Sequence, residues 1–282
     1  MTSFVAWIGV DARGPTSMYF ASDSRVSWGE GNGTFDLGAK LFTSNSEPEM
    51  FGFVGYVTLP QTILKKCVDL LDRSLRRDDQ SDSAQARSAW LFDMIKEHAE
   101  KHPQRNAGDF TIFHGMRLGE RKIGETEFRL FATKWTNINR ALELEEIPVP
   151  SDKSSVLRID GSGKPYVHDW SLQWKATDQG DTSRSVFSAF CDSLKEGRDK
   201  FSGGQPQLTG LYRMGAARTF GVVTDAGPSY QGTQNPMLNS SKIEWRDALF
   251  QRVDVAGIPL KGAQRQVRPK ALLLRQSAKS AK

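Results

Sequence analysis

The stretch TSFVAWIGVDARGPTSMYFASDSR, residues 2–25, carries the strongest signals for the fold. Residues 2–10 form a mostly apolar run that starts directly after the first methionine, and a second apolar run extends from Met18 to Ser22. Asp11 to Ser17 lies between them and has the residue types of a turn. The pattern predicts a β-hairpin whose first strand begins at residue 2.

Beyond this hairpin the chain groups its strands and helices into blocks. Apolar and β-branched runs predict further strands at 40–42, 50–58, 109–116, 127–135, from 155 onward, 207–213 and 218–224. Apolar residues at helical spacing predict helices at 60–75, 84–100 and 182–195. Strands, two helices, strands, one helix and strands in that order favour helices layered on mainly antiparallel sheets over an alternating βαβ fold.

The composition is that of an ordinary globular protein, with 282 residues, 38% hydrophobic and 25% charged. We find no apolar run near the ~20 residues needed to span a bilayer, and no secretory signal near Met1. Cys67 and Cys191 both fall on apolar helical stripes, which is typical of buried, reduced thiols. These features predict a cytoplasmic protein that does not bind a membrane.

The net charge of +5 is concentrated at the C-terminus. No acidic residue follows Asp254, and the basic residues after it contribute +7, which leaves the rest of the chain at −2. We predict that residues 225–282 form an extension, ending in a flexible basic tail, on a domain of residues 2–224. A basic tail is more often a solvated end than a binding site, so nucleic-acid binding is not expected.

Several familiar catalytic and binding patterns are missing from the sequence. His98 and His102 have the spacing of a helical metal pair but no third ligand, so we predict no metal site. Neither cysteine has a CxxC partner, and Gly29 to Gly33 is not followed by the Lys-Ser/Thr of a phosphate-binding loop. We therefore expect no metal and no organic cofactor.

The remaining candidate for chemistry is Thr2. A small second residue permits removal of Met1, which would leave a hydroxyl and a free α-amine on one residue. An α-amine with a pKa near 7.7–8.0 can accept the hydroxyl proton and so activate a threonine nucleophile. Threonine is common at position two, so this fact alone is weak.

Five further motifs follow Thr2 in a defined order. They are Ala21-Ser-Asp-Ser-Arg25, Ala39-Lys-Leu-Phe42, Phe53-Val-Gly55, Asp160-Gly-Ser-Gly163 and Arg198-Asp-Lys-Phe-Ser-Gly-Gly204. Together they resemble the proteasome β-subunit family of N-terminal nucleophile (Ntn) hydrolases, including its bacterial ancestral-β-subunit relatives, over residues 2–224. The resemblance implies an α+β fold: a four-layer αββα sandwich of two mainly antiparallel sheets flanked by helices.

The resemblance also assigns roles to individual residues. Thr2 matches the nucleophile, Asp23 and Lys40 its charged neighbours, and Gly55 the backbone N–H donor of the oxyanion hole. The residues matching the group that orients the terminal amine are Ser162, Asp199 and Ser202, with Gly203 allowing close backbone approach.

Binding roles follow from the same resemblance. Arg25 matches the arginine of the ASDSR motif, and Val26, Phe53 and Val57 match the pocket wall for the residue before the cut bond. The alternatives stay open: Asp23 could form a plain structural ion pair with Arg25 or Lys40. Gly55 could likewise be a glycine at a strand bend, and the apolar residues ordinary core.

The function implied by the resemblance is threonine-type hydrolysis of peptides or unfolded proteins. It also implies a homo-oligomeric ring or helical assembly, and it allows an ATP-dependent unfoldase as a partner, for which the sequence holds no direct sign. Alternatives are a small-molecule amidase with the same nucleophile and an inactive assembly subunit. A tail-mediated nucleic-acid binder is the third alternative.

Overall fold

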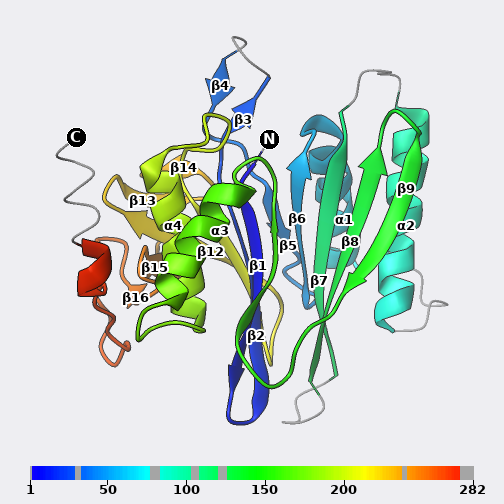
Figure 1. Cartoon of the computed structure of the whole chain (residues 1–282). Helices are drawn as coiled ribbons and strands as arrows, with labels where there is room; N and C mark the ends of the chain where they lie inside the picture. The colour runs from blue at the N-terminus through cyan, green and yellow to red at the C-terminus, as the bar shows by residue number, and fades with distance from the viewer. Residues whose placement is uncertain are drawn as a thin grey trace.

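The computed structural model describes residues 2–28, 33–76, 83–102, 108–119, 126–236 and 240–273. Within these ranges the chain forms two large, mainly antiparallel sheets that pack face to face, with helices on their outer sides (Figure 1). The mixed α/β architecture with antiparallel sheets, predicted from the sequence, is confirmed.

The larger sheet contains the first and the last strands of the described chain. Its strands are β1 (Phe4–Asp11), β2 (Gly14–Ser22), β10 (Ser155–Asp160), β11 (Gln207–Tyr212), β12 (Arg218–Thr224), β13 (Gly227–Tyr230), β14 (Thr233–Gln234), β15 (Trp245–Asp247) and β16 (Arg252–Val253). The order along the sheet is β10-β1-β2-β11-β12-β13-β14. β15 runs parallel to β12, and β16 pairs with β15. The N-terminal strand β1 therefore lies inside the sheet, between β10 and β2.

The smaller sheet is a simple antiparallel series. Its strands, in spatial order, are β5 (Leu41–Thr43), β6 (Glu49–Gly55), β7 (Phe110–Leu118), β8 (Glu127–Thr136) and β9 (Ala141–Ile147). A separate ribbon of β3 (Val26–Ser27) and β4 (Thr34–Phe35) projects from the end of the molecule at which β1 begins (Figure 1).

Each sheet has a helical pair on its outer face. α1 (Thr58–Asp72) and α2 (Ala84–Lys101) cover the smaller sheet, and α3 (Lys164–Lys175) and α4 (Ser183–Glu196) cover the larger one (Figure 1). A short 3₁₀ turn, Ser240–Lys242, precedes β15.

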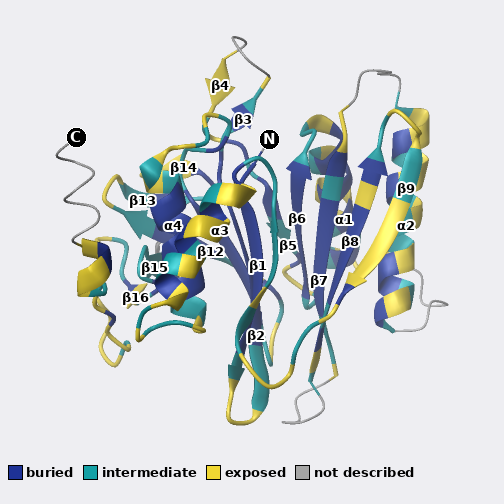
Figure 2. Ribbon diagram, in the orientation of Figure 1, coloured by how far each residue is buried: buried dark blue, intermediate teal, exposed yellow. Residues whose placement is uncertain are grey.

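Strand β1 explains why the N-terminal run is apolar without alternation. Phe4 and Ile8 belong to the core between the two sheets, whereas Val5 and Trp7 belong to the core beneath α4. Both faces of the strand are therefore covered, as the dark blue of β1 in Figure 2 shows. A strand buried on both faces has an apolar residue at nearly every position.

The sequence patterns did not predict helix α3, which begins with Lys164 and Pro165. Proline is tolerated in the first helical turn, where the backbone N–H has no partner inside the helix. Val167, Trp170 and Trp174 then bury one face of the helix. The predicted first helix ends at Asp72 rather than at Leu75.

Two further groups of strands were missed. β9 alternates leucine and glutamate over Leu142 to Glu145, but it carries four exposed residues in a row and is rich in glutamate, a residue type depleted in strands. The segment after Asp225 has irregular composition, yet β13 to β16 continue the larger sheet. The tail predicted to be flexible falls largely on residues 274–282, which lie outside the described residues.

Two findings concern the cysteines and the membrane. Cys67 on α1 and Cys191 on α4 are both free and buried. No helix in the described part of the chain is long and apolar enough to cross a membrane.

Candidate active site

Thr2 lies at the start of β1, where the smaller sheet contributes Lys40. It directly precedes β1, and its side chain is completely buried. The Lys40 ammonium, just ahead of β5 in the other sheet, donates to Thr2 Oγ1 over 3.1 Å. The structure therefore brings the predicted nucleophile and the predicted lysine into direct contact.

Asp23 holds this lysine in place. Asp23 follows β2, and its Oδ1 accepts a charge-assisted hydrogen bond from Lys40 Nζ at 2.8 Å. The backbone N–H of Ser3 also donates to Oδ1, and those of Arg25 and Gly203 donate to Oδ2. Both side chains of the ion pair are fully buried. These backbone donors stabilise the ionised carboxylate, which in turn fixes the ammonium beside the threonine hydroxyl.

The buried position of Lys40 changes its acid–base behaviour. Burial lowers the pKa of Lys40 from its usual value, and the attraction of Asp23 acts against that effect. A lysine with a lowered pKa can exchange a proton with a hydroxyl at 3.1 Å more readily than an exposed one. The pair can thus supply either a proton acceptor or a positive charge beside Thr2 Oγ1.

A second polar group lies at the backbone nitrogen of Thr2. Thr2 N–H donates to Ser162 Oγ at 3.2 Å, and the Ser162 hydroxyl donates to Asp199 Oδ2 at 2.7 Å. The Ser202 hydroxyl donates to the same Oδ2 at 2.6 Å. We call Ser162, Asp199 and Ser202 the serine–aspartate trio. It brings residues that are far apart in sequence to the backbone nitrogen of Thr2, the atom that would become the α-amine if Met1 were removed.

Glycines allow the backbone to close around Thr2. Gly161 has a φ of +90°, and a Cβ there would lie 2.0 Å from the carbonyl oxygen of Thr2. A Cβ on Gly163 would lie 1.8 Å from Ser3 Oγ. A side chain at either position would push the trio away from Thr2, which explains the Gly-Ser-Gly motif.

Arg25 and Gly203 lie next to Asp23, to which both donate a backbone hydrogen bond. The Arg25 guanidinium forms a two-point ion pair with Asp36, at 2.7 and 2.9 Å, and a Cβ on Gly203 would lie 2.6 Å from Arg25 Cζ. Among the contacts described for Arg25, only its backbone N–H reaches Asp23. Arg25 thus braces the loop that carries Gly203 rather than pairing with the buried aspartate.

The residues matched to the oxyanion hole and pocket wall are more scattered. Gly55 ends β6 with a φ of +93°, and a Cβ there would lie 2.3 Å from the Asp109 carbonyl oxygen, so the position requires glycine. Phe53 is fully buried in the core beneath α1 and α2, and Val57 packs against that core. Val26 is buried in the β3–β4 ribbon. No contact described for these four residues joins them to Thr2, and their assigned roles stay predictions.

Sequence reasoning missed one structural partner of the site, Gln207. This buried side chain accepts from the Lys40 backbone N–H at 3.0 Å and donates to the carbonyl oxygens of Asp23 and Gly38. It joins the segments that present the aspartate and the lysine. Its only sequence signal is a polar residue at the start of an apolar strand, which does not identify a contact partner.

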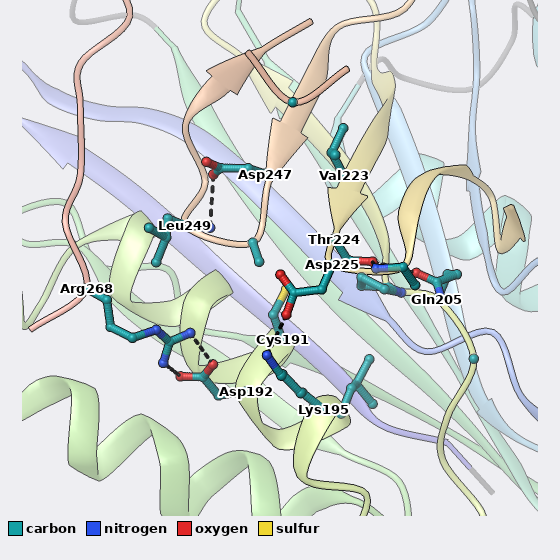
Figure 3. A pocket seen from close by; sticks show the side chains of 16 residues that line it. Cys191, Asp192, Lys195, Gln205, Val223, Thr224, Asp225, Asp247, Leu249 and Arg268 are labelled. Atoms are coloured by element: carbon teal, nitrogen blue, oxygen red, sulfur yellow. Dashed lines mark hydrogen bonds and ion pairs between the residues drawn. The ribbon is translucent and has the colours of Figure 1, made fainter. Parts of the chain in front are cut away.

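A cavity of the described chain lies elsewhere. It measures about 530 Å³ and is formed by α4, the end of β12 and the C-terminal segment (Figure 3). Ion pairs of Asp192 with Arg268 and of Lys195 with Asp225 line it, whereas Thr2 does not. At Thr2, by contrast, a buried hydroxyl lies within hydrogen-bond distance of a titratable lysine, the arrangement that a nucleophile requires. No group of three metal ligands occurs among the described residues.

Comparison with known proteins gives a likeness in fold. No protein-family model matches the chain, and no curated protein matches it. Among solved structures, the helical assembly of the Anbu complex from Pseudomonas aeruginosa is 14% identical. Its TM-score is 0.53, and the match covers 77% of this chain and 85% of that one. Anbu (ancestral β-subunit) from Yersinia bercovieri is 13% identical with a TM-score of 0.49, covering 76% and 82%.

These findings correct the sequence-based assignment to the proteasome β-subunit family, which is wrong as a statement of membership. No family model matches the chain, and the structural match at 14% identity with a TM-score of 0.53 establishes similarity of fold only. The chain has structural neighbours among the Anbu (ancestral β-subunit) proteins.

Proposed function

We propose that this protein is an N-terminal nucleophile hydrolase that uses Thr2, after removal of Met1, to cleave amide bonds. The observation that carries the proposal is the contact of Thr2 Oγ1 with Lys40 Nζ, itself held by the buried Asp23. If Lys40 and Asp23 formed only a structural ion pair, no hydroxyl would be needed beside the Lys40 ammonium. If Thr2 were only a core residue, no buried lysine would be needed beside its hydroxyl. The serine–aspartate trio at the Thr2 nitrogen is a second, independent support.

The chemistry follows from this arrangement. The Thr2 hydroxyl loses its proton to the free α-amine, assisted by the Lys40 charge, and Oγ1 attacks the substrate carbonyl carbon. The tetrahedral oxyanion needs a backbone donor, a role we propose for the N–H of Gly55, where one such donor can be worth ~3 kcal/mol. The protonated amine then gives its proton to the leaving nitrogen as the C–N bond breaks. Water hydrolyses the resulting ester and restores Thr2.

We propose peptides or unfolded proteins as the substrates, with threonine-type peptidase activity. In this interpretation the sheets and helices form the four-layer αββα sandwich of the Ntn hydrolases. Residues 2–224 are the catalytic domain, and residues 225–282 are an extension whose strands β13 to β16 enlarge the main sheet. Lys40, Asp23 and the trio would be needed for any amide substrate, so they support the reaction more strongly than the substrate class.

The structural neighbour from P. aeruginosa is a helical assembly. We therefore propose that this chain also self-associates, as a ring or an open helix, in the cytoplasm. An ATP-dependent unfoldase would be the partner that unfolds protein substrates and delivers them to such an assembly. Sedimentation of the purified chain tests the first point, since a monomer at all concentrations would contradict it.

Intact-mass spectrometry before and after treatment with a peptide epoxyketone tests the nucleophile. This reagent needs a hydroxyl and a free α-amine on the same residue. We expect loss of Met1 and a single adduct, absent in Thr2→Ala and retained in Thr2→Ser. Retention of Met1 in the purified protein, or an adduct that persists in Thr2→Ala, would overturn the proposal.

A further inference from the structure

The two halves of the serine–aspartate trio come from opposite ends of one helical pair. Ser162 directly precedes Gly163, the N-cap residue of α3, whereas Asp199 and Ser202 follow the end of α4 at Glu196. Gly197 ends α4 in the left-handed conformation, with a φ of 66°, and turns the chain toward Thr2. The 2.7 Å contact of Ser162 with Asp199 therefore depends on how the segment after α4 is held against the start of α3.

Arg198 lies within this segment and contacts α3 directly. Its Nη2 donates to Asp169 Oδ2 at 2.8 Å, and its Cζ lies 4.8 Å from the centre of the Tyr166 ring. Its Nε donates to Glu196 Oε2 at 2.8 Å, an oxygen that also accepts from Trp170 Nε1 at 2.7 Å. Tyr166, Asp169 and Trp170 lie on one face of α3, at the spacing of adjacent turns.

We infer that Arg198 is a positioning residue for the trio, an inference that rests on the proposed function. Arg198 ties the segment after α4 to the first turns of α3, and it is covalently adjacent to Asp199. The planar guanidinium binds the carboxylates of Asp169 and Glu196 and lies over the Tyr166 ring. These contacts limit the movement of the adjacent Asp199. The Asp199 carboxylate is thereby kept within reach of Ser162 and of the terminal amine. The Arg198 side chain itself is 37% exposed and does not touch Thr2 in the described contacts.

The charges around this contact explain why arginine suits the position. Asp169 and Glu196 place two carboxylates beside the segment that carries a third, Asp199. Without Arg198 these like charges would repel one another and favour movement of the loop. A lysine could neutralise the charge, but a single ammonium cannot hold both carboxylates and stack on Tyr166 in the same way.

The test compares Arg198→Met and Arg198→Lys with the wild type, with Arg213→Met as a matched control. Arg213 also forms a two-point ion pair, with Asp11, but lies at the far hairpin end of β1 and β2. One readout is the rate of Thr2 modification by the epoxyketone as a function of pH. The other is hydrogen exchange of a peptide covering residues 199–203, whose Phe201 and Gly203 amides donate to Asp199 and Asp23.

We expect Arg198→Met to slow modification about three- to tenfold and to shift the midpoint of the pH profile to lower pH, because an ammonium that loses a nearby carboxylate is easier to deprotonate. Exchange in residues 199–203 should become several-fold faster. Arg198→Lys should recover part of both effects, and Arg213→Met should show neither.

Two results separate this inference from the proposed function. If the wild type is not modified at Thr2 although Met1 is absent, the proposed function fails, and Arg198 is judged by hydrogen exchange alone. If Arg198→Met exchanges in residues 199–203 at the wild-type rate, or is modified with an unchanged rate and pH profile, the positioning role is refuted.

Discussion

Replacing Lys40 by methionine removes the ammonium group while keeping a flexible side chain of similar length. The Asp23 carboxylate would then remain fully buried, with its backbone donors but without its ion-pair partner. Breaking a buried ion pair by removing one partner costs about 3–5 kcal/mol. The backbone donors compensate part of the lost contact, so we expect a destabilisation near 3 kcal/mol.

The same substitution removes the cation beside the nucleophile. Loss of a positioned acid–base group lowers rates about 10²- to 10⁴-fold. We therefore expect the rate of Thr2 modification by an epoxyketone to fall at least about a hundredfold. Urea unfolding followed by circular dichroism measures the stability, and intact-mass spectrometry at timed intervals measures the rate, both at a temperature where the variant stays folded.

Two further variants separate stability from chemistry. Asp23→Asn combined with Lys40→Met leaves no buried charge, so part of the lost stability should return while the modification rate stays low. Lys101→Met removes only an exposed ion pair with Glu97 and should change neither quantity measurably. Modification of Lys40→Met at the wild-type rate would refute the assigned role of the lysine.

Three other substitutions or treatments have defined outcomes. The pKa of Glu49 is lowered to about 2: burial raises it, but His114 and Arg76 together have the larger, opposite effect. The contribution of the Glu49 carboxylate to the stability of the fold is therefore complete above pH ~4.5 and is lost as the pH falls toward 2. Glu49→Gln should cost about 3 kcal/mol at pH 7 and flatten the acid-unfolding curve, and equal acid slopes in both proteins would contradict this. Gly161→Ala should cost about 1–3 kcal/mol and impair Thr2 modification, since φ is +90° there; an unchanged Tm would show that the backbone relaxes. Burial raises the pKa of the Cys67 thiol, so iodoacetamide should label it only after unfolding, and rapid native labelling would show that α1 opens.

Local patterns were sufficient for much of the architecture. The apolar run at the N-terminus predicts β1, because a strand covered on both faces needs apolar residues throughout. The helical spacing of Ile63, Leu64 and Cys67 predicts α1 in the same way. Helix α3 and strand β9 were missed, because a proline in the first turn of α3 and the glutamate-rich composition of β9 weaken the usual signals of a helix and a strand.

For the site, the sequence by itself determined which residues were available: a threonine at position two, a glycine on each side of Ser162, and the carboxylates of Asp23 and Asp199. The tertiary structure decided which of them meet. Strand pairing of β1 with β10 and β2 brings Ser162 and Asp23 to Thr2, and packing of the second sheet adds Lys40. It also decided that Arg25 pairs with Asp36. Such contacts depend on sheet order and on burial, which are properties of the whole chain and are not encoded in any one segment.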